Sequence, residues 1–351
     1  MTDVGSADES EQGSDAGEGS ERNGDGGITR RRMLFGGAGG LAAVGGGRAI
    51  YNTSLGYGEF GMGTNLLQQD LGPLLTERLS TEYDGTIAGT RVRFDGSTIA
   101  VGERGENGLS VAEDGQSDAA EVDRKLGFDG RLEELFVDLS AFHAGEYAFE
   151  FHEPEAFFER FAEVDARPGI VAAIRGDRDR TVDPDVVERF AGADPADPRA
   201  LVEGLVAGFR EHTSYDVPRY VAGSIEDNVL FGAYDLRQYF EGDVGFEALL
   251  ENGDTGIFCW ELVFRSMEAL QSVSPGEQTV PIATCYVSDV RHKHAFTGVV
   301  GAIREDGELR LPTTFLDYTH STLYDDFHLT AFLGEGLAAY NSGHRADEIF
   351  W

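Results

Sequence analysis

The chain has 351 residues, and its 28 Lys and Arg residues face 63 Asp and Glu residues, which gives a formal charge of −35. Hydrophobic residues make up 41% of the sequence, enough to form a buried core, so a wholly disordered chain is excluded. Binding to nucleic acid by phosphate neutralisation is excluded as well, because the dominant electrostatic effect would be repulsive. No run of about 18 or more apolar residues occurs, so the sequence predicts no ordinary membrane-spanning helix.

The charged residues are unusual in kind as well as in number. Only two of the 28 basic residues are lysines, Lys125 and Lys293, and the others are arginines. Acidic residues are dispersed along the whole chain, which keeps a surface hydrated, whereas a local acidic patch would indicate a cationic partner. This composition resembles that of proteins from salt-adapted archaea, in which high salt screens the self-repulsion. The charge therefore indicates that the protein works in concentrated salt, and it says little about its activity.

The start of the chain carries the features of an export segment. Residues 1–27 are acidic and rich in Gly and Ser, which predicts a disordered tail. In residues 28–49, Arg30, Arg31 and Arg32 precede a short apolar run diluted by glycine, a pattern that resembles a twin-arginine signal. The resemblance implies the twin-arginine export machinery as a partner, an extracellular or cell-surface location, and membrane contact only through an uncleaved signal. A basic linker followed by a spacer of small residues is the alternative.

Residues 50–195 are predicted to form a β-rich N-terminal domain of α+β type. Runs that alternate between apolar and polar residues predict strands, and leucines at helical spacing predict the first helix. Asp95-Gly96 separates two β-type runs and predicts a hairpin turn. In chain order, the predicted elements are a helix at 64–82, a hairpin of 91–94 and 98–101, strands at 133–140 and 146–152, a helix at 154–164 and a strand at 170–174.

Residues 196–351 are predicted to form a second α+β domain, in which helices pack on one face of an antiparallel sheet. A stretch rich in Asp, Arg and Pro at 177–199 separates it from the first domain. The helices are predicted at 199–211, 257–270 and 332–340, and the strands at 280–287, 294–303 and 309–316.

Cys259 lies in the first turn of the helix predicted at 257–270. Val263, Met267 and Leu270 follow it at helical spacing, so its side chain is predicted to face the packed side of the helix. A cysteine at a helix N-terminus is a suitable nucleophile, because the helix dipole and the backbone N–H groups favour its thiolate. Such a nucleophile needs a base that is oriented by a third group.

Later segments supply residues of the kinds that this chemistry needs. Cys259 is followed by the predicted strand at 280–287, by His294-Ala295-Phe296, and by Phe315-Leu316-Asp317-Tyr318-Thr319. This order resembles the core of the transglutaminase-like superfamily, which is related to papain, over residues 198–320. The resemblance implies that Cys259 is the nucleophile, His294 the general base and acid, and Asp317 the residue that orients His294, with no cofactor. It also implies acyl transfer or hydrolysis on amide or ester bonds of a protein or peptide substrate.

Other interpretations of the same residues stay open. A catalytically inactive transglutaminase-like scaffold or binding protein of the cell envelope would carry the same pattern, and a disulfide between Cys259 and Cys285 would favour it. His344 is predicted at the surface or at a helix cap, and Trp260 is expected to pack against the preceding segment. A metal site is a third interpretation, which would use His292, His294, His320 and His328.

Overall fold

The computed structural model describes residues 69–96, 98–102, 107–110, 115–162, 164–176, 182–228, 230–231, 233–239, 242–290, 294–319 and 344–351. All of them belong to one compact unit, Leu41–Trp351. The tail predicted at 1–27, the signal segment predicted at 28–49 and the helix predicted at 332–340 lie outside the described residues. Within the described part of the chain, no helix combines the length and the apolar character needed to cross a membrane.

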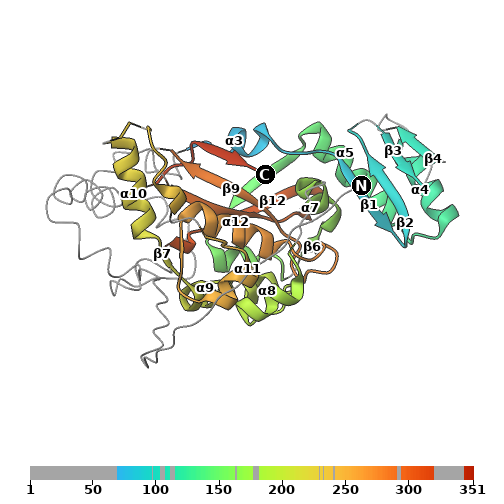
Figure 1. Ribbon diagram of the computed structural model, residues 1–351. Coiled ribbons are helices and arrows are strands. Elements are labelled where there is room, and N and C mark those ends of the chain that lie inside the picture. The colour runs from blue at the N-terminus through green and yellow to red at the C-terminus, as the bar shows by residue number, and fades with distance from the viewer. Residues whose placement is uncertain are drawn as a thin grey trace, which may run out of the picture. The chain divides into compact units, whose positions relative to one another are not determined.

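A four-stranded antiparallel sheet comes first in the chain (Figure 1). Its strands, in chain order and in sheet order, are β1 (Tyr83–Ile87), β2 (Thr90–Phe94), β3 (Thr98–Val101) and β4 (Asn107–Ser110). The β2–β3 hairpin confirms the turn predicted at Asp95-Gly96, where Gly96 has a φ of 88° that favours glycine. Val92 and Ile99 of this sheet join a buried core with the helix α5 (Arg131–Ala144).

Two segments that were predicted as strands are helices. Residues 133–140 lie within α5, and residues 170–174 lie within α7 (Pro168–Arg175). In α7, Pro168 occupies the first turn, where its fixed φ favours a helix. The buried apolar residues of α5 recur at intervals of three and four and form a helical stripe, consisting of Leu132, Leu135, Phe136, Leu139 and Phe142. Both strand predictions are therefore wrong, and residues 50–195 are more helical than expected.

The other helices of this region are close to their predicted positions. Within the described residues, the helix predicted at 64–82 corresponds to α3 (Gly72–Glu77), which is shorter than predicted. The helix predicted at 154–164 is α6 (Pro154–Glu159). Two further helices, α4 (Gly115–Leu126) and α8 (Pro184–Ala191), had no predicted counterpart.

A second sheet has seven strands and is mostly antiparallel. β5 (Tyr147–Phe151) is the exception, because it pairs with β12 in parallel, with Phe149 opposite Leu311. The remaining strands follow the order β13 (Glu348–Phe350), β9 (Ala283–Asp289), β10 (His294–Val300), β12 (Glu308–Leu316), β11 (Ile303–Glu305) and β6 (Asp165–Ala166). The strands predicted at 280–287, 294–303 and 309–316 correspond to β9, to β10 with β11, and to β12, so the α+β class is confirmed.

Strands from both sides of the predicted domain boundary share this sheet. β5 and β6 precede residue 195, whereas their partners β12 and β11 follow it. The sheet therefore spans the boundary that was predicted between residues 50–195 and 196–351.

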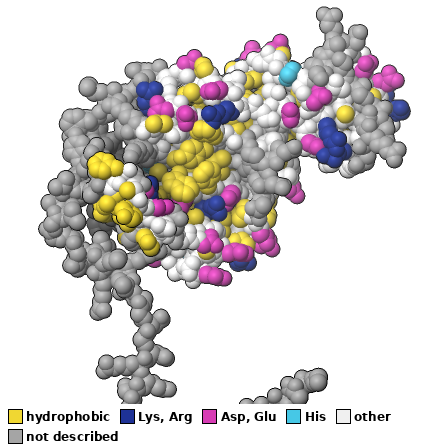
Figure 2. Space-filling model, turned by 45° about the horizontal axis from the view of Figure 1, so that its top comes forward, with side chains coloured by type: hydrophobic (Ala, Val, Ile, Leu, Met, Phe, Trp, Pro, Cys, Tyr) yellow, Lys and Arg dark blue, Asp and Glu magenta, His cyan; other side chains and the backbone are white. Residues whose placement is uncertain are grey.

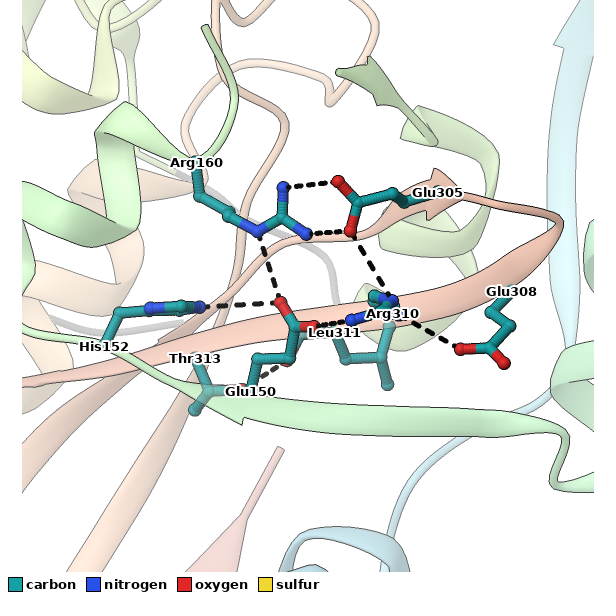
Figure 3. Close-up of polar contacts among 8 residues, drawn as sticks. All are labelled: Glu150, His152, Arg160, Glu305, Glu308, Arg310, Leu311 and Thr313. Carbon is teal, nitrogen blue, oxygen red and sulfur yellow. Dashed lines mark hydrogen bonds and ion pairs between the residues drawn. The ribbon is translucent and has the colours of Figure 1, made fainter. Parts of the chain in front are cut away.

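Charged side chains also connect these elements (Figure 3). Glu150 of β5 accepts a hydrogen bond of 2.6 Å from Arg310 of β12 and one of 3.3 Å from Arg160, which ends α6. Arg160 in turn donates to Glu305 of β11 at 2.5 Å. The network fixes β5 and α6 against the β11–β12 hairpin.

Helices pack on both faces of the seven-stranded sheet: α8, α9, α11 and α12 on one face, and α5 and α7 on the other. Val299 and Leu316 join a buried core with residues of α8, α9, α11 and α12, whereas their neighbours Val300 and Phe315 join cores on the opposite face. The bounds of these helices are α9 (Pro198–His212), α11 (Phe246–Asn252) and α12 (Cys259–Leu270). α9 and α12 confirm the helices predicted at 199–211 and 257–270, and α12 lies against β9 and β10.

Candidate active site

Cys259 is the first residue of α12. The N-cap residue Phe258 has an extended backbone, and its N–H donates a hydrogen bond of 2.8 Å to the carboxylate of Glu261. This contact satisfies a backbone donor at the helix start and fixes the first turn. Only 8% of Cys259 is exposed. The structure therefore places the thiol at the positive end of the helix dipole and mostly out of water.

A short parallel ladder determines how the chain approaches Cys259. β7 (Thr213–Tyr215), which follows α9, pairs with β8 (Thr255–Ile257), which precedes α12. Asp216 then packs closely against Gly256: a Cβ at Gly256 would lie 2.7 Å from the Asp216 carboxyl carbon. A larger residue at this position would have to displace the Asp216 side chain.

A buried arginine links the segments on either side of the ladder. Arg219 of α10 (Val217–Asn228) forms an ion pair with Glu261, and its Nε lies 3.5 Å from Asp216 Oδ2. Its guanidinium also lies over the Phe258 ring, 4.1 Å from the centroid. Because a buried charge without its partner is strongly destabilising, these pairs hold the start of α12 in one position. No local sequence pattern indicates these pairs, since Arg219 and Glu261 are 42 positions apart.

His294 and Asp317 form a buried pair at the ends of neighbouring strands. His294 begins β10, and Asp317 directly follows β12, its antiparallel partner. His294 Nε2 lies 2.9 Å from Asp317 Oδ2, and the exposed fraction of both side chains is 0%. Asp317 Oδ1 accepts a further hydrogen bond from the Thr319 N–H at 3.0 Å. The carboxylate is thus fixed on one side by backbone and contacts the imidazole on the other.

Cys259, the third residue of the predicted site, contacts this pair: its side chain hydrogen-bonds with His294. Burial alone would lower the pKa of His294, but the charge and hydrogen bond of Asp317, together with Cys259, raise that pKa to about 10. Since Nε2 faces Asp317, Nδ1 is the ring nitrogen left for the thiol. Cys259 and His294 thus occupy the relative positions that a thiol nucleophile and its general base require.

His344 is a residue of this site that the sequence did not indicate. The prediction of a surface or cap position is wrong, because His344 is 4% exposed and its ring centroid lies 5.2 Å from that of His294. Its Nδ1 lies 3.1 Å from Asp289 Oδ2. No periodic pattern surrounds His344, and its contacts come from strands about fifty positions earlier, so only the tertiary structure reveals it.

Two partly exposed aromatic side chains follow Cys259 on α12. Trp260 and Phe264 are each 44% exposed, so Trp260 is less buried than the sequence led us to expect. Phe264 stacks on Tyr286, which packs on the apolar cluster that contains Cys259. Burial and the nearby Cys259 raise the pKa of Tyr286 to about 12. In Figure 2, hydrophobic side chains gather near the middle of one face, while acidic side chains are scattered around them.

The structure also bears on the alternative interpretations. No disulfide joins Cys259 and Cys285. The physical reason is the alternation of β9: Tyr286 faces the cluster of Cys259, while Cys285 packs in the core on the opposite face. Among the residues that the structure describes, no group of His, Cys, Asp and Glu side chains is arranged to hold a metal ion. His292, His320 and His328 lie outside those residues.

Comparison of the chain with protein-family models, with curated proteins and with solved structures found no match. The function is therefore inferred from the geometry of the site.

Proposed function

We propose that this chain is a transglutaminase-like cysteine acyl transferase or hydrolase. Cys259 is the nucleophile, His294 the general base and acid, and Asp317 the residue that orients and stabilises His294. The proposal is supported above all by one observation: a buried chain of hydrogen bonds runs from Cys259, at a helix N-terminus, through His294 to Asp317. Helices packed on a mostly antiparallel sheet are consistent with a transglutaminase-like core in residues 196–351. The proposed substrate is a protein or peptide, and the chemistry needs no cofactor.

In the proposed reaction, the Cys259 thiolate attacks the carbonyl carbon of an amide or ester, and a C–S bond forms. The bond to the amine or alcohol then breaks, and the imidazolium of His294 gives its proton to this leaving group, so that a thioester remains on Cys259. In the second half, neutral His294 takes a proton from water or from an amine as that nucleophile attacks the thioester. The C–S bond breaks and the thiolate is restored. Asp317 stabilises the imidazolium whenever it forms.

Acylation by an activated ester tests this proposal. With p-nitrophenyl acetate, the peptide that contains Cys259 should gain one acetyl group, detected by mass spectrometry, together with a burst of p-nitrophenol. His294→Ala should slow this acylation by at least about 100-fold, a typical contribution of general acid–base catalysis. Cys285→Ala is the matched control, because it removes the other thiol and should leave the burst intact.

Two results would contradict the proposal. Acetylation that persists in Cys259→Ser would show that another residue reacts. A wild-type Cys259 that acylates no faster than in His294→Ala would show that the two side chains are not coupled. The chain would then be the inactive scaffold that the sequence left open.

A further inference from the structure

A second imidazole–carboxylate pair lies directly beside the first. Asp289 ends β9 and is the cross-strand neighbour of His294, the first residue of β10. Asp289 has an exposed fraction of 0%, and its Oδ2 faces His344 Nδ1 at 3.1 Å and accepts the Arg345 N–H at 3.2 Å. The two pairs, Asp317 with His294 and Asp289 with His344, therefore meet at adjacent strand ends.

The His294 ring packs against two other rings that also contact each other. Phe296 meets it edge to face, with a centroid distance of 4.4 Å and an interplanar angle of 85°. His344 lies at 5.2 Å and is tilted by 30°. Phe296 and His344 are themselves 5.1 Å apart at 71°, so the three centroids form a triangle and the imidazole lies in a corner between two ring walls, which we call the slot. Contacts with both walls restrict how the imidazole can turn about its side-chain bonds.

Only one of the two imidazoles is suited to carry the proton. The charged and titratable groups that face His294 in the described residues are Cys259 from α12, Asp317 after β12, Asp289 from β9, and His344 from the C-terminal segment. Asp317 and Cys259 favour the charged form of His294, whereas burial and the charge of His294 lower the pKa of His344. In the neutral form, His344 donates from Nδ1 to Asp289 and presents an uncharged ring to the imidazolium.

We propose that His344, held by Asp289, is a positioning residue of the reactive pair: its ring forms one wall of the slot that keeps His294 aligned between Cys259 and Asp317. This inference rests on the proposed function, because alignment matters only if the imidazolium stabilises the thiolate. His344 itself takes no proton from the substrate. The C-terminal segment that begins at His344 thus completes a site whose other parts lie on α12, β10 and β12.

Variants at position 344 separate alignment from chemistry. His344→Ala removes the wall, His344→Phe keeps a ring of similar shape without the imidazole nitrogens, and Asp289→Asn weakens the contact that holds the ring. The rate of Cys259 alkylation by iodoacetamide is measured across pH for each variant in the full chain. Protection of the fully buried Cys285 from the same reagent reports that the sheet stays folded.

We expect His344→Ala to slow Cys259 alkylation near pH 6 by about tenfold, because a poorly aligned imidazole assists the attacking thiol less well. The acid limb of its pH profile should move upward as well. His344→Phe should stay within about threefold of the wild type, and Asp289→Asn should fall between the two. A role in stability alone would lower the melting temperature of His344→Ala and leave its acid limb in place, which would overturn the inference.

Two further outcomes are informative. If His344→Phe lost as much reactivity as His344→Ala, the imidazole nitrogens would act chemically and a positioning role would be refuted. If Cys259 of the wild type reacted only as fast as an ordinary thiol, the proposed function would fail instead. In that case the slot is still tested in Cys259→Ser, where NMR detects the proton between His294 Nε2 and Asp317. When His344→Ala is combined with Cys259→Ser, the NMR signal of that proton should be lost or shifted. An unchanged signal would refute the role of His344 in positioning His294.

Discussion

Replacement of Asp317 by asparagine should remove the charge that keeps His294 protonated. The 2.9 Å contact between His294 Nε2 and Asp317 Oδ2 is fully buried, so solvent does not screen it. Asparagine has nearly the same shape and still accepts a hydrogen bond through its amide oxygen. The substitution therefore tests charge with little change in packing.

The magnitude follows from the geometry. With the two charges delocalised over the imidazole and the carboxylate, an effective separation of about 4 Å and an effective dielectric constant of about 20 give an attraction of about 4 kcal/mol. One pKa unit corresponds to about 1.4 kcal/mol, so the loss amounts to about three units. The pKa of His294, which the intact pair raises to about 10, should fall to about 7 in Asp317→Asn. Burial opposes the charged form of His294 in both proteins, so it does not add to this shift.

The pH dependence of alkylation by iodoacetate measures this shift. Iodoacetate is an anion and reacts best while the thiolate is paired with the imidazolium, so its rate falls as pH rises through the pKa of His294. The reaction is run in about 1 M salt, which screens the negative charge of the protein. The basic limb should move from near pH 10 to near pH 7 in Asp317→Asn.

A matched control is Asp138→Asn, at a second buried aspartate whose partners are Arg304 and Arg167. It should lower stability and leave the basic limb unchanged, because it lies outside the site. A basic limb that stays near pH 10 in Asp317→Asn would refute the assignment of Asp317 as the group that raises the pKa of His294.

Three other predictions concern stability and export. The melting temperature should rise between about 0.1 M and about 3 M salt, because salt screens the repulsion among 35 excess negative charges, and a salt-independent value would contradict the halophilic interpretation. Glu150→Gln should lower the free energy of unfolding by about 1 kcal/mol in a denaturant titration, since it removes the charge from the partly exposed ion pair with Arg310. Glu159→Gln, at an exposed position, is the control, and an equal loss there would speak against the network. Replacement of both Arg30 and Arg31 by lysine should retain the protein in the cell, as judged by immunoblots of cell and medium fractions, and undiminished secretion would remove the proposed twin-arginine route.

The part of the fold that was predicted best is the part built from long periodic segments. α9 and α12 carry clear apolar stripes, and β9, β10 and β12 follow one another with polar turns, so each was placed within a few residues. Short apolar runs are ambiguous, and the segments of α5 and α7 were assigned to strands for that reason. The parallel pairing of β5 with β12 joins residues about 160 positions apart, and no local pattern specifies it.

The same distinction applies to the site. Cys259, His294 and Asp317 could be proposed from residue type and order, because each lies at the start or end of a predictable element. The supporting residues could not, since Arg219, Asp289 and His344 act through contacts between distant segments. Their functions depend on which segments the sheet and helices bring together, and this is a property of the tertiary structure.

Salt should affect the charged surface more than the site, because the charges of the site are buried. At about 1 M salt the Debye length is about 3 Å, so the repulsion among exposed carboxylates is largely removed. The pairs formed by Arg219 with Glu261 and by His294 with Asp317 lie almost wholly out of water, where mobile ions do not reach them. Salt should therefore change how much of the chain is folded without changing the protonation of His294 in the folded molecules. Asp317 therefore keeps the pKa of His294 raised across the range of salt that the acidic surface tolerates.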